Sequence, residues 1–255
     1  MSRIFITGST EGIGRAAARS LLNQGHEVVL HARSKERASA VNDFVAGTAG
    51  IVIGDLRSAA ETRSIAEQVN AIGRMDAVIH NAGIYSEPRR SRTPEGHPSI
   101  LAVNTLAPFM LTALIERPQR LIYLSSGLHR NGENSLRDLD WTERAWDQAR
   151  AYAESKLHVV ALAFYLARHW PNVFSNAVNP GWVRTRMGGS GAPVDLETGQ
   201  RTQSWLATST EPAALVSGRY WHNLKQEQPA AEATQATFQD ALVVRLQEIT
   251  GVRLP

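Results

Sequence analysis

Tyr152 and Lys156 are the residues of this sequence whose types and spacing most directly suggest proton-transfer chemistry. They are four residues apart in a predicted helix, so both side chains should lie on one face, one turn apart. An ammonium group stabilises the anion of a nearby phenol, so we expect the pKa of Tyr152 to fall from about 10 towards neutrality and the phenol to act as a general acid or base. Surface pairing also produces this spacing, so the pair gains its meaning from the residues that accompany it.

A glycine-rich loop near the start of the chain suggests nucleotide binding. It follows a β-branched and aromatic run at residues 3–6 and precedes a helical pattern at residues 13–22, so it joins a strand to a helix. We expect Gly8 to turn the chain at positive φ, Gly12 to admit a pyrophosphate close to the backbone, and Gly14 to let the helix lie close to the strand. The N–H groups and the helix dipole would then favour phosphate groups. The GxxxGxG spacing differs from the GxGxxG of the dinucleotide fingerprint, and a glycine-rich turn without a ligand is the alternative.

Asn104 lies in a predicted helix over residues 101–114, four residues before Pro108. Because proline has no N–H, the Asn104 carbonyl loses its usual helical partner. A freed acceptor inside a helix needs another partner, and we expect an ordered water there. The alternative is a simple kink.

Continuous apolar strands alternate with helices along the chain, which is typical of a parallel sheet covered on both faces. We therefore expect an α/β fold of the Rossmann type, a doubly wound parallel sheet of about seven strands, in a single domain over residues 1–255. Polar residues stand just past the carboxyl ends of the strands, where open α/β sheets bind ligands, so we predict one shared site at this edge. The predicted strands cover residues 3–6, 28–32, 51–53, 77–80, 121–124 and 173–178, a helix is predicted over residues 34–45, and the polar residues at the strand ends are Thr7, Arg33, Asp55, Asn81, Ser126 and Asn179.

The composition limits the other classes of function. The chain has 255 residues, 43% of them hydrophobic, which suits one well-buried domain. Its net charge of +3 comes from scattered basic residues and is too weak for nucleic-acid binding. The absence of cysteine excludes disulfides and cysteine-ligated zinc, and we expect no metal site. No apolar run reaches the length of a membrane span and the first strand begins at Arg3, so we expect a soluble cytoplasmic protein.

The residues after the second predicted strand favour NADP(H) over NAD(H). NAD-binding folds usually place an acidic residue here, which bonds the adenosine ribose hydroxyls. This sequence instead has Arg33, with His31, Ser34 and Lys35 around it, and these groups can pair with a 2′-phosphate. The alternative is that Arg33 is a solvated loop residue, and Glu11 in the glycine loop is an unfavourable charge nearby.

Together these motifs resemble the short-chain dehydrogenase/reductase family over essentially the whole chain. The retinol-dehydrogenase-like branch is the most similar part of the family, because residues 129–150 lengthen the interval between Ser126 and Tyr152. Members of that branch often carry an N-terminal membrane anchor that this sequence does not show, so membrane attachment and retinoid substrates are not expected to carry over. The matching segments are the loop from Thr7 to Gly14, Asp55 and Leu56, Asn81-Ala82-Gly83, Asn104, Ser125 and Ser126, Tyr152 to Lys156, and Pro180-Gly181 through Thr185.

The resemblance implies a role for each matching residue. Ser126 would bond the substrate carbonyl, Tyr152 would transfer the proton, and Lys156 would hold the nicotinamide ribose and lower the tyrosine pKa. Asn104 would tie a relay water to Lys156. The cofactor would also contact the glycine loop (Gly8, Ser9, Thr10, Glu11, Gly12, Ile13 and Gly14), and Arg33 would meet its 2′-phosphate. Its adenine would lie by Asp55 and Leu56, its ribose by Asn81, Ala82 and Gly83, and its nicotinamide carboxamide near Pro180, Gly181, Val183 and Thr185.

Three further expectations concern the surroundings of the site. Residues 186–207, with three glycines near their start, are expected to form a hinged, apolar substrate lid. Three tryptophans (Trp141, Trp146 and Trp205) would line the pocket or simply fill the core. Family members often pair through the helix that carries Tyr152, so a homodimer or homotetramer is expected if the apolar surface of Leu157, Ala161, Phe164 and Tyr165 forms the interface; burial within the same chain is the alternative.

The sequence therefore favours an NADP(H)-dependent carbonyl reductase or alcohol dehydrogenase with a fairly apolar small-molecule substrate. A regulator of the same fold that senses NADP without turnover is the main alternative, but it would be expected to lose Tyr152 or Lys156. A serine hydrolase using Ser126 and His129 is disfavoured, since the GxSxG elbow is missing.

Overall fold

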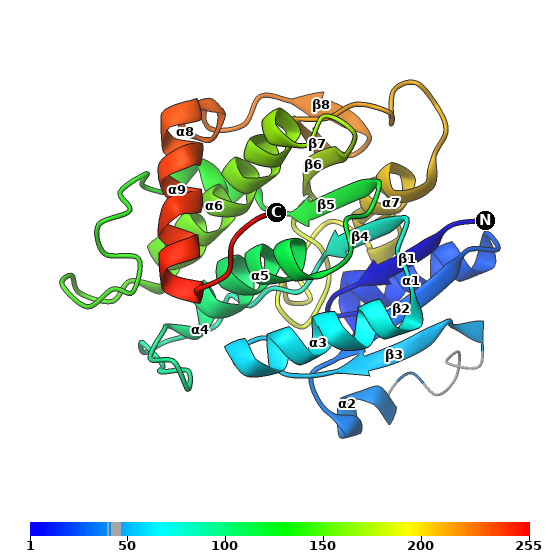
Figure 1. Ribbon diagram of the computed structural model, residues 1–255, viewed down its shortest axis with the longest axis horizontal. Helices are drawn as coiled ribbons and strands as arrows, with labels where there is room; N and C mark the ends of the chain where they lie inside the picture. The colour runs from blue at the N-terminus through cyan, green and yellow to red at the C-terminus, as the bar shows by residue number, and fades with distance from the viewer. Residues whose placement is uncertain (40, 42–46) are drawn as a thin grey trace.

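The structure is a computed structural model that describes residues 1–39, 41 and 47–255. An eight-stranded sheet lies at its centre, in the order β3-β2-β1-β4-β5-β6-β7-β8 (Figure 1). The first seven strands are parallel, and β8 pairs antiparallel with β7. The expected Rossmann-type doubly wound fold is confirmed. The strands are β1 Arg3–Ile6, β2 Glu27–Ala32, β3 Gly50–Ile53, β4 Ala77–His80, β5 Arg120–Leu124, β6 Phe174–Asn179, β7 Arg219–His222 and β8 Lys225–Glu227.

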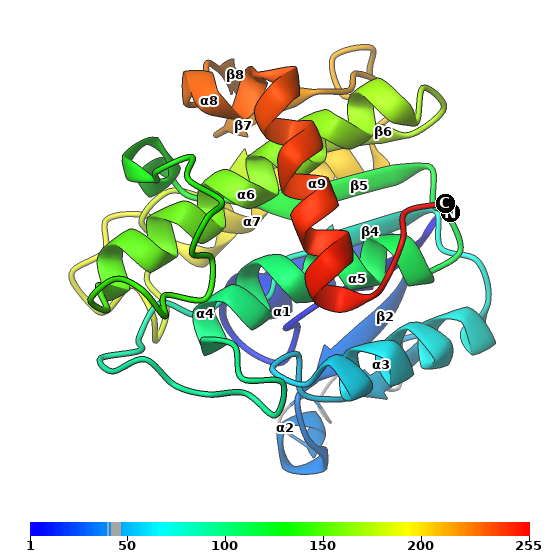
Figure 2. The ribbon, with the colours of Figure 1, turned by 60° about the vertical axis from the view of Figure 1, so that its left-hand side comes forward.

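Helices cover both faces of the sheet (Figures 1 and 2). Alternate side chains of β1 point to opposite faces, so Ile4 and Ile6 join the core beneath α1 and α7, whereas Phe5 joins the core beneath α3, α5, α6 and α9. Both cores are closed to solvent, which makes the sheet a rigid platform for its carboxyl edge. The helices are α1 Gly12–Asn23, α2 Lys35–Ser39, α3 Ala59–Ile72, α4 Ser99–Leu101, the π-helix η2 Ala102–Leu106, α5 Ala107–Leu114, the 3₁₀ helix η3 Gly127–Asn131, α6 Gln148–His169, α7 Leu196–Thr208, α8 Ala231–Thr234 and α9 Ala236–Thr250.

The sheet has one strand more than the seven expected, because β7 and β8 form a hairpin. Its two turn residues, Asn223 and Leu224, both have positive φ, 48° and 62°. Two-residue hairpin turns of this kind match the twist of the strands and usually contain glycine. A leucine in the second position gives no such signal, which is why the sequence did not predict the hairpin.

One predicted helix is described only in part. The sequence predicts a helix over residues 34–45; α2 covers Lys35–Ser39, and Val41 lies in a turn. Residues 40 and 42–45 lie outside the part of the chain that the structure describes.

The helix that carries Tyr152 is covered by its own chain. The C-terminal helix α9 packs across α6, as Figure 2 shows. Leu157 and Ala161, the residues proposed for a subunit interface, are both 0% exposed, while Phe164 and Tyr165 are partly buried against the same core. The structure therefore favours the alternative of burial within the chain for this face.

Across the described residues, no helix is both long enough and apolar enough to cross a membrane. Within the same ranges, no group of three histidine, aspartate or glutamate side chains is arranged to hold a metal ion.

Candidate active site

The predicted site residues gather at the carboxyl edge of the sheet, where the strand order reverses between β1 and β4. Such a reversal leaves a crevice between the loops that leave the two strands in opposite directions. Asn81 joins these loops, because its Nδ2 donates to the carbonyls of Thr7 (2.9 Å) and Gly8 (3.1 Å). The Thr7 hydroxyl in turn accepts from the Ala82 N–H at 3.0 Å. The two loops are thus one hydrogen-bonded unit.

The glycine loop has the conformation that the sequence predicts. Gly8 and Gly12 have φ of 64° and 58°, in the left-handed region that favours glycine. Gly14 lies so close to its neighbours that a Cβ would overlap the Gly8 carbonyl and the Asn81 amide. His31 supports the loop from β2. Its ring Nδ1 accepts from the Gly8 N–H at 2.9 Å, and its backbone N–H donates to Ser9 Oγ at 2.8 Å.

The rest of the loop begins α1. Ser9 and Thr10 are buried, Ile13 packs on the core of the α1 face, and Glu11 is the N-cap residue. The Glu11 side chain makes no capping hydrogen bond, so the first backbone N–H groups of α1 lack the acceptor that an N-cap side chain usually supplies. An anionic group at this position would therefore meet unsatisfied donors and the positive end of the helix dipole.

Several features of the crevice fit a dinucleotide. Gly83 leaves room beside the ammonium group, because a Cβ there would lie 3.2 Å from Lys156 Nζ. Gly12 leaves room beside Thr185 in the same way, because a Cβ added at Gly12 would lie 3.4 Å from Thr185 Cγ2. Asn81 Oδ1 is buried and has no hydrogen-bond partner among the described residues, so a donor from a ligand would satisfy it.

Charged side chains surround Glu11 rather than leaving it isolated. Its two carboxylate oxygens pair with Arg37 (3.3 Å) and with Arg186 (2.8 Å). Arg33 is exposed at the end of β2, and its charge helps to lower the pKa of Asp55. Three arginines therefore lie around the open end of the glycine loop, and the Glu11 carboxylate pairs with two of them.

Asp55 and Leu56 follow β3 but face different surroundings. Burial opposes ionisation of Asp55, but hydrogen bonds and charge from Arg57 outweigh it and hold the pKa of this carboxyl below its usual value. The Arg57 Nε lies 2.9 Å from Asp55 Oδ2. Leu56 is 6% exposed and packs in the core under α3, so its side chain supports the wall of the crevice.

Asn104 lies in a π-helical turn. The Ala107 N–H bonds the Ala102 carbonyl five residues back, so the helix widens directly before Pro108. The Asn104 amide is buried and fully used: Oδ1 accepts from Ile84 N (2.9 Å), and Nδ2 donates to Ile84 O (2.9 Å) and Ser155 Oγ (3.0 Å). Asn104 thereby fixes the loop after β4 against α6, and a water on its carbonyl stays a prediction.

Tyr152, Lys156 and Ser126 are brought together by α6 and the end of β5. Lys156 Nζ lies 5.6 Å from the centre of the Tyr152 ring and donates to the Leu124 carbonyl at 2.9 Å. Ser126 is half-buried and interacts with the Tyr152 hydroxyl. Tyr85 meets the Tyr152 ring edge to face, 4.9 Å between ring centres. The phenol therefore lies among a hydroxyl, an ammonium group and an aromatic wall.

The expected fall in the tyrosine pKa is contradicted by this geometry. Burial raises the pKa of Tyr152 to about 12, although the interaction with Ser126 opposes the rise. Burial also lowers the pKa of Lys156 to about 8, because the ammonium group is cut off from water. Desolvation is the largest cause of both shifts. At neutral pH the phenol is in its proton-donating form.

The segment after β6 forms the opposite side of the crevice. Pro180 and Gly181 leave the strand, Val183 forms a bridge with Val194, and Thr185 Oγ1 accepts from the Gly188 N–H at 3.0 Å. Trp182 and Met187 are 61% and 50% exposed. The predicted lid, residues 186–207, contains a loop and most of α7. The helix α7 packs on α1, with Leu206 and Ala207 in the core. Only residues 186–195 remain candidates for a mobile lid.

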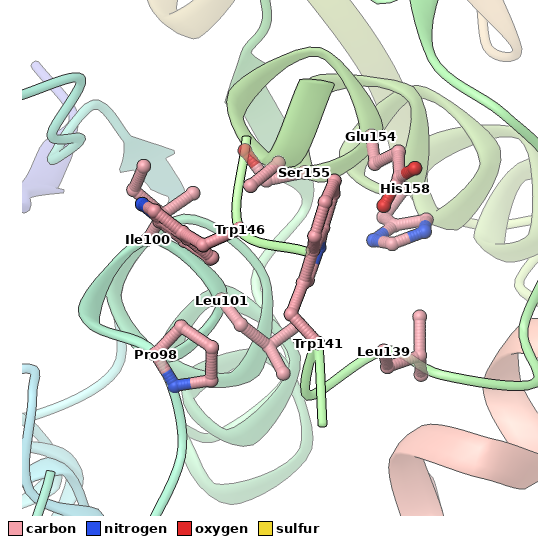
Figure 3. Close-up of a pocket in the computed structure, with 10 residues that line it drawn as sticks. Pro98, Ile100, Leu101, Leu139, Trp141, Trp146, Glu154, Ser155 and His158 are labelled. Atoms are coloured by element: carbon pink, nitrogen blue, oxygen red, sulfur yellow. The ribbon is translucent and has the colours of Figure 1, made fainter. Parts of the chain in front are cut away.

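The three tryptophans separate into two groups. Trp141 belongs to a small apolar cluster with Tyr152 and Ile100, and Trp146 packs against it. Ile100, Trp141 and Trp146 line a cavity of about 10 Å³, with room for about one water, next to His158 (Figure 3). Burial lowers the pKa of His158 to about 3, so its ring is neutral. Trp205 instead meets Trp221 edge to face, 5.2 Å between ring centres, on the other face of the sheet.

His129 does not activate Ser126 as a hydrolase would require. Its Nδ1 lies 2.7 Å from the backbone carbonyl of Ser126, and its Nε2 accepts from the Ala230 N–H at 2.9 Å. Both ring nitrogens are therefore occupied by backbone groups, which leaves neither for the Ser126 hydroxyl.

Comparisons with known proteins identify the family of the chain. The family model described as Enoyl-(Acyl carrier protein) reductase matches residues 8–216. Short-chain dehydrogenase chyC of Penicillium rubens is 43% identical, with all of both chains covered. The chain belongs to the short-chain dehydrogenase/reductase family.

Human retinol dehydrogenase 13 is 30% identical over 99% of this chain and 85% of its own, which agrees with the expected branch. A blue fluorescent protein from a metagenomic library, solved with NADPH, shares the fold with a TM-score of 0.71 at 22% identity, covering 87% of this chain and 95% of its own.

The sequence did not single out several side chains that this short-chain dehydrogenase/reductase brings to the site. Arg37 follows Arg33 by one turn of helix, a spacing that could have indicated a second cation. Tyr85 and Arg186 are distant in sequence from the residues they meet, and no local pattern marks them. His129 was considered only as a base.

We predict that the buried ammonium group of Lys156 makes stability depend on pH. The unfolded chain holds this proton up to about pH 10.5, whereas the folded chain releases it near pH 8, so stability should rise between these values. Urea unfolding at pH 7.5 and 9.5 should show the wild type gaining on the order of 2 kcal/mol relative to Lys156→Met. Lys225→Met, at an exposed lysine, should retain the wild-type profile. Identical pH profiles for wild type and Lys156→Met would contradict the burial argument.

Proposed function

We propose that this protein is an NADP(H)-dependent carbonyl reductase or alcohol dehydrogenase of the short-chain dehydrogenase/reductase family. The observation that carries the proposal is the protonated phenol of Tyr152, adjacent to Ser126 and Lys156 and next to a crevice that fits a dinucleotide. When bound, the nicotinamide would accept or supply the hydride. A regulator that binds NADP without turnover remains the alternative, and the retention of all three side chains argues against it.

In the reducing direction, the chain's own groups supply the proton and the orientation. Ser126 would donate a hydrogen bond to the substrate carbonyl and stabilise the charge that develops on its oxygen. Tyr152 would transfer its proton to that oxygen as the carbonyl carbon receives the hydride, giving an alcohol. Lys156 would stabilise the phenolate left behind until a proton returns from solvent, by way of Asn104 and a water.

The glycine loop, Asn81, Gly83 and Thr185 would hold the cofactor. Arg33 and Arg37 would bind the adenosine 2′-phosphate, which supports NADP(H) as the preferred cofactor. Exposed apolar side chains follow β5 and β6 at the same edge of the sheet, where Leu128 is 44% exposed and Trp182 and Met187 more so. They support a fairly apolar carbonyl compound as the substrate.

Tyr152→Phe should abolish turnover and leave NADPH affinity nearly unchanged, because only the proton-donating hydroxyl is removed. We expect kcat to fall by a factor of about 10² to 10⁴ in assays that follow NADPH absorbance with ketones and aldehydes. Tyr165→Phe removes the same atom from a partly exposed position on the same helix and should match the wild type. Turnover of Tyr152→Phe within threefold of the wild type would exclude Tyr152 as the proton donor.

Arg33→Ala should weaken NADPH binding by roughly 1 kcal/mol or a little more and leave NADH binding almost unchanged, since only NADPH carries the 2′-phosphate. Arg37→Ala should do the same, whereas Glu11→Gln should tighten NADPH binding, because it releases Arg37 and removes a repulsive charge. Fluorescence titration of both cofactors measures these changes. Equal losses for NADPH and NADH would show that the arginines do not contact the phosphate.

We also propose that residues 186–195 form a lid that orders when cofactor and substrate bind. Gly189 has φ of 77° and Gly191 has no atom within 4 Å of an added Cβ, so this stretch has conformational freedom. Hydrogen exchange in this segment should slow when NADPH and a competitive inhibitor are added together. High protection in the free protein that does not rise on binding would identify a rigid wall instead.

A further inference from the structure

His129 links the candidate catalytic serine to the C-terminal part of the chain. It is fully buried in η3, directly after β5. Its Nδ1 is 2.7 Å from the Ser126 carbonyl oxygen, and its Nε2 is 2.9 Å from the Ala230 nitrogen. On one side its ring lies against Tyr220 of β7, 4.6 Å between ring centres. No other role in the proposed reaction uses this side chain.

The two partners determine the tautomer of His129. A carbonyl oxygen only accepts, so Nδ1 must carry the hydrogen, and an N–H group only donates, so Nε2 must be bare. The ring is then neutral, in agreement with burial, which lowers the pKa of His129. Among the two neutral tautomers, only this one satisfies both backbone groups.

The bond to the Ser126 carbonyl bears on where the serine hydroxyl points. Ser126 is the extended N-cap residue of η3, with φ of −157° and ψ of 155°, and its Oγ accepts from Leu128 N at 3.2 Å. Holding its carbonyl fixes ψ, and with it the orientation of the Cα–Cβ bond relative to the following turn. The Ala230 N–H holds the far end of the imidazole, so the ring cannot rotate away from the carbonyl.

We propose that His129 is a positioning residue for Ser126, and that the Ala230 amide, from the segment before α8, completes the arrangement. Catalytic efficiency then depends on a backbone N–H that lies 101 residues away in sequence. The inference rests on the proposed function, in which the Ser126 hydroxyl binds the substrate carbonyl. It extends the reaction's requirements to the C-terminal segment.

Ala230→Pro tests this link by removing the donor to His129. Proline lacks the N–H and its fixed φ suits the −55° of Ala230, but its Cδ takes the place of the hydrogen that points at His129 Nε2, so the substitution also displaces the imidazole. Ala231→Pro is the matched control, because it places the same residue at the first position of α8, where proline is tolerated and His129 is not contacted.

With NADPH and 4-nitrobenzaldehyde as probes, Ala230→Pro should lower kcat about tenfold, the effect of one lost hydrogen bond, and change KM less than threefold. NADPH affinity should stay at the wild-type value, the melting temperature should fall because the buried His129 Nε2 loses its donor, and Ala231→Pro should match the wild type throughout. In a Ser126→Ala background, Ala230→Pro should have no further effect, because the group that it positions is absent.

Two kinetic results would overturn the proposal. One is wild-type kcat for Ala230→Pro, and the other is an equal loss in the Ser126→Ala background, which would show a general structural effect. Nitrogen-15 NMR of His129 tests the geometry without turnover, and a hydrogen on Nε2 would overturn the inference whatever the activity. A wild-type tautomer with no turnover on any carbonyl compound would instead remove the proposed function and, with it, the role of Ser126.

Discussion

The burial of the Lys156 ammonium group is the constraint on which the site depends. A cation removed from water needs hydrogen-bond acceptors around it and space free of steric overlap. Leu124 supplies a carbonyl from the end of β5, and the Ser125 hydroxyl donates to the Lys156 carbonyl at 3.0 Å. Gly83 keeps the space beside Nζ open from the loop after β4. The relative positions of two strands and α6 are therefore all fixed around one nitrogen atom.

Most of the framework could be predicted from the sequence because its signals are local. The glycine loop, the polar residues at the strand ends and the spacing of Tyr152 and Lys156 each report a backbone requirement within a few residues. The π-turn at Asn104 was partly foreseen, since the missing N–H of Pro108 disturbs the helix, but the structure solves the problem by widening the turn.

What escaped the sequence depends on contacts between distant segments. The tyrosine pKa was expected to fall because spacing reveals the nearby charge but not the burial that opposes it. The pairing of Glu11 with Arg37 and Arg186 joins three segments that are distant in sequence, so a charge that looked unfavourable in the sequence links them. The β7–β8 hairpin turns through a leucine, a residue that no turn pattern selects. Each miss is a case where tertiary structure overrides local propensity.

The position of α9 has a consequence for how the catalytic helix keeps its shape. A surface completed by a second copy of the chain is subject to mass action, so its integrity weakens on dilution. Here α9 lies on α6 as part of the same polypeptide, with Leu242 and Leu246 wholly buried. The local concentration of that cover is set by the covalent connection and does not change with the amount of protein. The cover that α9 gives to this face of α6 is therefore the same in a dilute solution and in a concentrated one.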